Sequence, residues 1–349
     1  MASSTGLMSS LAAWAAATAA VAMIAYALVL PSACDDVQDC IVSHASIPNR
    51  FDTYSAYALA AMLIYEIASL ASTFWGARRT KELVRDLESP CLPSLLLVVM
   101  FAVLVLQHSV YGATSGGWYA HARPTLEGVK LPGHAVYTFT YIEWLITVPL
   151  LLTVAAHCAL GRPLEEVHRP VLVTNIYIVF AWAAQLITNE ELQWTLVTVT
   201  LAMYAWASYD MVMWVVEYLK VAPSHLSSRC LRPCLALGLI AIFAFYGVVY
   251  MSTFLGLITS QTERMCHLFF DVGSKLAMAI VFVAIRAIDY HDTLAGVLRH
   301  MSTSNRAMIS ILRGSFDVVL PCIVDDTGIC KLPDRSSGAV DIVRLEGSL

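Results

Sequence analysis

The feature that most constrains this chain is a series of apolar stretches, each close to 20 residues long. A helix needs about 20 apolar residues to cross the hydrocarbon core of a bilayer. Eight stretches qualify, at residues 8–30, 52–76, 92–115, 134–158, 169–188, 191–218, 233–257 and 264–290. Only 13% of the residues are charged, against about 25% in soluble domains. The sequence therefore predicts an all-α integral membrane protein.

The first stretch is open to two interpretations. Its many small residues are compatible with a signal peptide, but no basic residue precedes it and its apolar run is long for one. We expect a retained extra helix at the N-terminus, followed by a bundle of seven.

The distribution of Lys and Arg predicts the orientation. The loops after the second, fourth and sixth stretches hold Arg78, Arg79, Lys81, Arg85, Arg162, Arg169, Lys220, Arg229 and Arg232. The alternate loops hold only Arg50, Arg123, Lys130 and Arg264. Because basic residues favour the cytoplasmic side, both termini are predicted to be cytoplasmic.

Charge and cysteine usage exclude several classes of function. The net charge is -5 and no basic cluster suggests binding to nucleic acid. The nine cysteines have no regular spacing, so a disulfide framework is not expected, although Cys34 and Cys40 are placed to pair in an outer loop. We find no pattern typical of a metal site, a phosphate-binding loop or a nucleophilic triad.

The chain divides into three predicted parts. Residues 1–51 hold the extra helix and an outer loop, residues 52–291 the seven-helix bundle, and residues 292–349 a more polar segment. Within the last part, residues 293–314 have apolar positions at helical spacing, which predicts a cytoplasmic amphipathic helix. The remainder is a tail or linker that is too short for an ordinary catalytic domain.

Ionisable residues inside the apolar stretches are the first candidates for function, because they are costly in a membrane. Asp271 and Lys275 lie four residues apart and so share a helix face. A carboxylate one turn away keeps such a lysine charged. This pairing suits a protonated Schiff base with its counterion, and a structural ion pair is the alternative.

Two other stretches carry matching features. The fourth contains Glu143 with Trp144 and Thr147 nearby on the helix surface, followed by Pro149, which removes a backbone hydrogen bond. The seventh contains three aromatic residues on one face, Phe243, Tyr246 and Tyr250. Such a stripe is compatible with core packing or with a surface for an elongated polyene.

Together these motifs resemble those of the microbial, or type I, rhodopsins. The segment Glu143-Trp144-x-x-Thr147-x-Pro149-Leu150-Leu151 resembles their third helix, and Asp271-Val272-x-x-Lys275 resembles their seventh. The aromatic triplet is similar to their sixth helix. The resemblance covers about residues 52–290 and implies the seven-helix rhodopsin bundle.

The resemblance also implies a cofactor and a site. All-trans retinal would be bound covalently to Lys275, with Glu143 as primary counterion and proton acceptor and Asp271 as second counterion. The implied contacts of the chromophore are Trp144, Thr147, Val148, Phe243, Tyr246 and Tyr250. Glu263 matches a family glutamate near the outer surface.

Several positions depart from the family pattern. Thr140 stands where the family usually has an arginine, Val154 stands at the position of the proton donor of pumps, and Gly247 replaces a proline. The third stretch has Gln107 and His108 but no carboxylate, which argues against the cation-conducting channelrhodopsins.

The extra helix resembles that of enzyme-linked rhodopsins or of rhodopsins fused to bestrophin channels. The sequence therefore predicts a photoreceptor in membrane lipid that is not itself an enzyme within these residues, signals to a cytoplasmic effector and forms a homo-oligomer. The alternatives are a light-gated ion channel, a slow light-driven proton pump and an unrelated transporter. Glu66 and Asp210, inside the second and sixth stretches, mark either a proton or ion path or polar contacts between helices.

Overall fold

A computed structural model describes residues 50–79, 91–113, 121–122, 135–187, 189–222, 227–315, 323–324 and 330–331. The predicted first helix and the Cys34 and Cys40 pair lie outside these residues. The chain forms two compact units, residues 1–288 and 289–349, and each is considered by itself.

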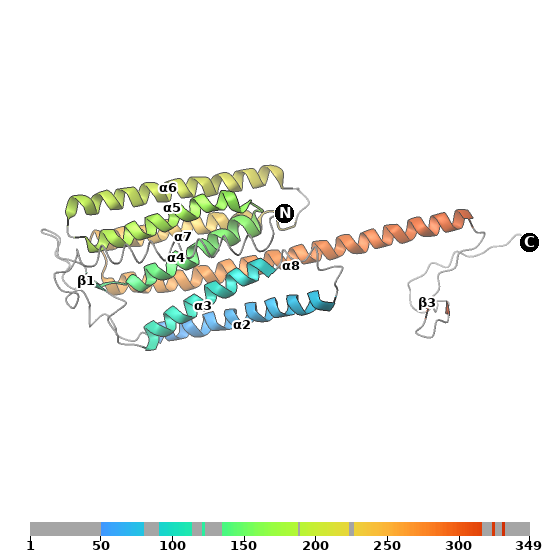
Figure 1. Cartoon of the computed structure of the whole chain (residues 1–349), viewed down its shortest axis with the longest axis horizontal. Helices are drawn as coiled ribbons and strands as arrows, with labels where there is room; N and C mark the ends of the chain where they lie inside the picture. The colour runs from blue at the N-terminus through green and yellow to red at the C-terminus, as the bar shows by residue number, and fades with distance from the viewer. Residues whose placement is uncertain are drawn as a thin grey trace, which may run out of the picture. The chain divides into compact units, whose positions relative to one another are not determined.

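The first unit is a bundle of long helices that run side by side (Figure 1). Its elements are α2 (Arg50–Arg79), α3 (Cys91–Ala113), β1 (His121–Ala122), β2 (Ala135–Val136), α4 (Thr138–Thr153), the π-helix η3 (Val154–Ala159), α5 (Leu164–Leu186), α6 (Glu190–Val221), α7 (Leu231–Phe254) and the N-terminal half of α8 (Ser260–Ser315). Within the described residues, seven of the helices are long and apolar enough to span a bilayer. These correspond to the second to eighth predicted stretches.

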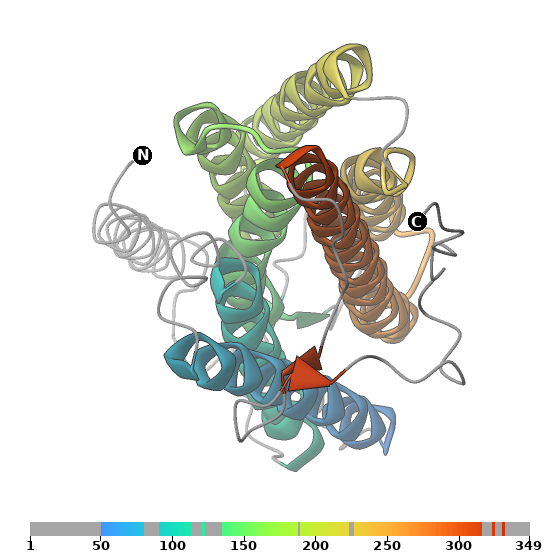
Figure 2. The same cartoon turned by 90° about the vertical axis from the view of Figure 1, so that its right-hand side faces the viewer.

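The end-on view in Figure 2 places α2 (blue) on one side of the bundle and α6 (yellow-green) on the other, with α4 (green) between them. Strands β1 and β2 pair antiparallel in a short hairpin at one end of the bundle. The helices α2 and α3 approach closely: a Cβ atom added to Gly112 would lie 2.8 Å from Thr53 Oγ1. Any larger residue at this position would therefore force Thr53 to shift.

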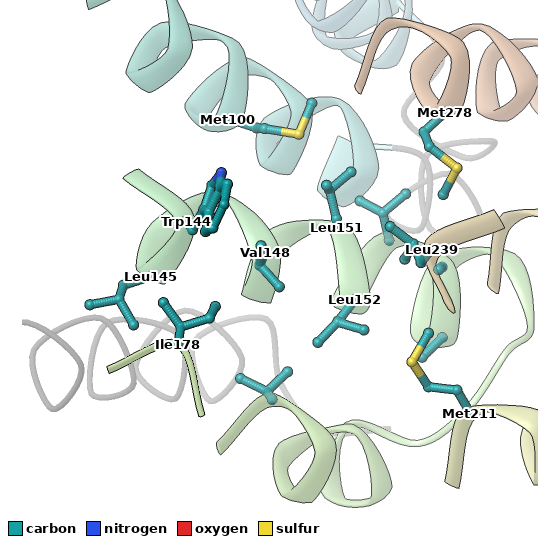
Figure 3. Close-up of a cluster of buried hydrophobic side chains, with 14 of the residues drawn as sticks. Met100, Trp144, Leu145, Val148, Leu151, Leu152, Ile178, Met211, Leu239 and Met278 are labelled. Atoms are coloured by element: carbon teal, nitrogen blue, oxygen red, sulfur yellow. The ribbon is translucent and has the colours of Figure 1, made fainter. Parts of the chain in front are cut away.

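The core of the bundle gathers around α4. Trp144, Val148 and Leu151 follow one another along this helix, and Met100 of α3 and Ile178 of α5 pack from other helices (Figure 3). These side chains are buried. The helix that carries Glu143 is thus fixed by neighbours on several sides.

The α4 helix changes its winding after Pro149. Proline lacks an amide hydrogen and its ring crowds the preceding turn. The chain then adopts the π-helix η3, and Thr153 Oγ1 donates to the Pro149 carbonyl at 2.8 Å. Gly161, at φ 69°, terminates the helical run. The proline that the sequence places in this helix is therefore followed by a π-helical turn.

The amphipathic helix predicted for residues 293–314 is the C-terminal part of α8 and not a separate helix. No Gly or Pro lies between residues 289 and 293 to end α8. In the second unit, β3 (Ile323–Val324) and β4 (Cys330–Lys331) pair antiparallel.

Candidate functional site

The amine of Lys275 lies between two carboxylates in the middle of the bundle. Its Nζ atom is 2.6 Å from Glu143 Oε1 and 2.7 Å from Asp271 Oδ1. The spacing of four residues in α8 brings Asp271 alongside the lysine, whereas Glu143 comes from α4. The three residues are at most 3% exposed. Buried charges persist only when they are paired, so this arrangement keeps a cation inside the membrane.

Hydrogen bonds from neighbouring side chains orient both carboxylates. Asp271 Oδ1 accepts from Trp144 Nε1 at 3.1 Å and from the Tyr246 hydroxyl at 3.2 Å. The Thr147 hydroxyl donates to Glu143 Oε1. The other oxygens, Glu143 Oε2 and Asp271 Oδ2, are buried without a hydrogen-bond partner in the protein. Each acid therefore has one fixed oxygen and one that is available to a ligand or to water.

An apolar cavity begins at Trp144 and Tyr246, whose rings stack with centroids 5.0 Å apart. Its lining comes from α4, α5, α6, α7 and α8: Tyr141, Trp144, Val148, Tyr177, Ile178, Ala181, Thr200, Leu201, Tyr204, Phe243, Tyr246, Gly247, Tyr250 and His267. Both Trp144 and Tyr246 also donate to Asp271, which touches the Lys275 amine. The cavity therefore lies next to the charged centre.

The structure brings together the residues predicted for the site. Glu143, Asp271, Trp144, Thr147 and Tyr246 surround the Lys275 amine or orient its acids. Val148, Phe243 and Tyr250 line the cavity, as Trp144 and Tyr246 also do.

The contributions of α5 and α6 to the cavity were not predicted. Tyr177 lies on α5, and Thr200 and Tyr204 lie on α6. The Thr200 hydroxyl is buried without a hydrogen-bond partner. Aromatic residues at exposed positions of the same helix, such as Trp206 and Tyr209, have similar sequence surroundings, so no signal separated the two groups.

A second, polar cavity of about 20 Å³ lies against Asp271 and His267. Such a volume has room for a water molecule. Its lining includes Thr140, where the family arginine is missing, and Arg264 of α8. Arg264 donates to Asp52 Oδ2 at 2.6 Å. A guanidinium therefore enters this cavity from α8 and not from α4, and no sequence pattern indicated this.

Aromatic rings and a histidine complete the surroundings of Arg264. Its guanidinium lies 5.2 Å from the ring centroids of Tyr111 and Tyr137. His108 Nδ1 lies 3.2 Å from Asp52 Oδ1. Burial raises the pKa of the Tyr137 phenol above its usual value, and the nearby charge of Arg264 opposes this rise. Tyr137 precedes the membrane-spanning part of α4 and acts as a neutral ring.

The other acids considered from the sequence form contacts between helices. Glu66 of α2 pairs with Arg286 of α8 at 3.0 Å, and Asp210 of α6 pairs with Arg169 of α5 at 3.6 Å. Among the described residues, no group of three or more His, Cys, Asp or Glu side chains is arranged to hold a metal ion.

Comparison with known proteins adds independent information. The family model described as bacteriorhodopsin-like protein matches residues 95–288, more than half of the chain. Sensory rhodopsin-2 of Haloarcula vallismortis is 24% identical over 155 residues, which are 44% of this chain and 64% of that protein. The match thus spans slightly less than two thirds of the relative's length.

Two crystal structures share the fold. The transmembrane domain and linker region of Salpingoeca rosetta rhodopsin phosphodiesterase matches with a TM-score of 0.52 and 14% identity, covering 86% of this chain and 90% of that chain. The light-driven proton pump Coccomyxa subellipsoidea rhodopsin matches with a TM-score of 0.52 and 15% identity, covering 68% and 97%. At these identities the similarity establishes the fold alone.

Proposed function

The chain belongs to the bacteriorhodopsin-like family, and we propose that it is a photoreceptor in which all-trans retinal is attached covalently to Lys275. The observation that carries this proposal is the position of the Lys275 amine, which is buried between Glu143 and Asp271 beside an apolar cavity. The cavity fits a polyene, because its lining is mostly aromatic and aliphatic. Two oriented carboxylates fit the positive charge of a protonated Schiff-base nitrogen.

Retinal, when bound, supplies a light-driven isomerisation that turns the Lys275 nitrogen. Glu143 is the proposed proton acceptor, because its Oε1 is 2.6 Å from that nitrogen. Thr147 holds this oxygen in place, while Trp144 and Tyr246 hold Asp271. Asp271 thereby retains a negative charge beside the lysine when a proton moves to Glu143.

The absorption spectrum of the purified chain with all-trans retinal, in the dark and after illumination, tests the proposal. Lys275→Ala should abolish the visible band, because none of the cavity-lining residues in the described part of the chain is a lysine. Lys220→Ala, which removes an exposed lysine at the end of α6, should leave the band unchanged. A visible band that survives in Lys275→Ala would disprove the assignment.

We propose that the output is a signal and not net ion transport. Val154, at the position of the proton donor of pumps, is buried and carries no proton. Without a donor at this position, the proton should return slowly to the Lys275 nitrogen, and a slow return suits a sensor. The matched rhodopsin phosphodiesterase structure contains a linker region, and we assign residues 292–349 of this chain to coupling with a cytoplasmic effector. From the distribution of Lys and Arg in the loops we propose that both termini are cytoplasmic. We also propose that the chain forms a homo-oligomer.

A light-gated channel or a slow proton pump is the second candidate, and the polar cavity beyond Asp271 favours it. That cavity offers a route for a proton from Asp271 towards Asp52 and Arg264. Photocurrents under voltage clamp separate the candidates: a current that reverses with voltage indicates a channel, a one-directional current a pump, and no current a sensor. Membership of the family removes the alternative of an unrelated transporter.

A further inference from the structure

Three cations of α8 follow one another at intervals of 11 residues: Arg264, Lys275 and Arg286. Eleven residues make close to three turns of an α-helix, so successive members differ by only about 20° around the axis and about 16.5 Å along it. The three side chains therefore leave α8 on one face, with Lys275 midway between the arginines. Each of them meets a buried carboxylate.

The first arginine belongs to a cluster that we call the Asp52 clamp, formed by Asp52, His108 and Arg264. Arg264 Nη2 donates to Asp52 Oδ2 at 2.6 Å, and His108 Nδ1 lies 3.2 Å from Asp52 Oδ1. Asp52 is 2% exposed. This clamp lines the same polar cavity as Asp271, so its charges act directly on the counterion.

The second arginine belongs to the Glu66 clamp, formed by Glu66, Ser94 and Arg286. Arg286 Nη2 lies 3.0 Å from Glu66 Oε1 and 3.2 Å from Oε2, and Nη1 donates to the Ser94 hydroxyl. Glu66 is fully buried. None of the three residues lines the apolar cavity or the polar cavity, so this clamp is separate from the chromophore.

The two clamps are built from the same three helices. Asp52 and Glu66 lie 14 residues apart on α2, and Ser94 and His108 lie 14 residues apart on α3. Fourteen residues make about four turns, so each pair shares a helix face. One face of α2 and one face of α3 therefore meet the cation face of α8 at two heights, on either side of Lys275.

We infer that the two clamps position Lys275 by fixing the height and rotation of α8 against α2 and α3. This inference rests on the proposed function. Sliding or turning α8 would separate buried charges, which is costly because each partner would lose its counter-charge in a low-dielectric surrounding. The guanidinium of Arg286 is held at two points, because Nη2 contacts the Glu66 carboxylate and Nη1 donates to the Ser94 hydroxyl. Two points of attachment on a planar group constrain its orientation as well as its distance. The lysine nitrogen is thereby held against Glu143.

The Glu66 clamp offers the sharper test, because it lies three helical turns from Lys275 and outside both cavities. The variants are Glu66→Gln, Arg286→Gln and the double variant in the full chain loaded with retinal. The measurements are the rate of bleaching by hydroxylamine in the dark and the midpoint of thermal unfolding. The control is Asp210→Asn, which breaks the Arg169 and Asp210 pair between α5 and α6.

Each single variant should bleach at least about fivefold faster than the wild type and unfold at a lower temperature, since it leaves either the buried Glu66 or the partly buried Arg286 without its counter-charge. The double variant removes both charges, so its midpoint should return towards that of the wild type. Its bleaching should stay fast, because nothing then holds α8 at that height. The control should bleach at the wild-type rate.

Hydrogen exchange of residues 270–288 in the apoprotein gives a readout that does not depend on retinal. The two single variants and the double variant of the Glu66 clamp should exchange faster there, and the control Asp210→Asn should not. Recovery of both the midpoint and the bleaching rate in the double variant would show that the pair is only structural and would overturn the inference. Wild-type exchange in both single variants would also overturn it. A wild-type chain that binds no retinal would instead refute the proposed function, and the exchange measurement would still test the clamp.

Discussion

The two sides of the Lys275 amine are built by different means. On one side, Glu143, Asp271 and the more distant Arg264 and Asp52 are fixed by ion pairs and hydrogen bonds at 2.6 to 3.2 Å. On the other side, the cavity lining consists mainly of aromatic rings and aliphatic side chains. Directional contacts fix the positions of the charges on the first side, whereas the apolar side determines the shape of the cavity.

This difference predicts which amino-acid substitutions each side should tolerate. An apolar wall is sensitive to volume, because overpacking forces neighbours from their preferred positions. A charged wall is sensitive to the removal of a single partner, because the remaining charge stays buried. Changes of volume should therefore affect chromophore binding, and changes of charge should affect colour.

The largest expected effect comes from filling the cavity. Gly247 of α7 lines it, and a Cβ atom added there meets no other atom within 4 Å. Gly247→Leu should fold normally but occupy the space of the polyene. Overpacking costs about 1–3 kcal/mol, so retinal binding should weaken by about 5-fold to 140-fold. Titration of the apoprotein with retinal, followed by visible absorption, measures this.

A matched control exists on α8. Gly273 is also free of contacts around an added Cβ atom, but it is exposed and does not line the cavity. Gly273→Leu should therefore bind retinal like the wild type. Equal loss of binding in both variants would mean that leucine harms the helices in general, and full binding in Gly247→Leu would place the chromophore elsewhere.

The next effect concerns the charged side. Glu143→Gln removes one of the two negative charges that pair with the Lys275 nitrogen. A weaker negative charge there stabilises the ground state less, so the absorption maximum should shift to the red. Asp271 still pairs with the lysine, so the loss of stability should stay below the about 3–5 kcal/mol expected for a lone buried charge. Spectra and thermal unfolding measure the two quantities.

Glu166→Gln serves as the reference for this variant, because Glu166 is an exposed acid of α5 that pairs with Arg162. Its spectrum should match that of the wild type. An unchanged absorption maximum in Glu143→Gln would remove Glu143 from the role of counterion and leave Asp271 as the candidate.

The same contrast explains what could be predicted from the sequence. Glu143, Asp271 and Lys275 could be identified because a charge in an apolar stretch is costly and rare. Helix periodicity then placed Asp271 beside Lys275. The cavity residues of α5 and α6 could not be identified, because Tyr177 and Tyr204 differ in no local feature from aromatic residues that face lipid.

Arg264 and the length of α8 were missed for other reasons. The sequence assigned Arg264 to an outer loop, whereas the structure places it in the first turns of α8 with its guanidinium directed to Asp52. A long side chain on a helix end can reach inward or outward, and only the partner on α2 decides which. The predicted end of the last span followed a change in composition, but no helix-breaking residue stands there.

The smallest expected effect comes from a substitution on the apolar side, where one buried hydroxyl has no hydrogen-bond partner in the protein. Thr200 of α6 is buried in the cavity wall, and its Oγ1 makes no hydrogen bond in the protein. Thr200→Val removes this group at nearly constant shape. An unsatisfied buried polar group costs about 1–3 kcal/mol, so the apoprotein should gain about 1 kcal/mol of stability, measured by thermal unfolding.

Thr253→Val on α7 provides the opposite case, since the Thr253 hydroxyl is equally buried but donates to the Val249 carbonyl at 3.0 Å. That variant should lose about 1 kcal/mol. The absorption maximum of Thr200→Val should move less than that of Glu143→Gln, because a neutral dipole in the wall has a weaker field than a carboxylate against the nitrogen. A larger shift in Thr200→Val would mean that the cavity lining sets the absorption maximum. The assignment of colour to the charged side of Lys275 and of chromophore binding to the apolar side would then be wrong.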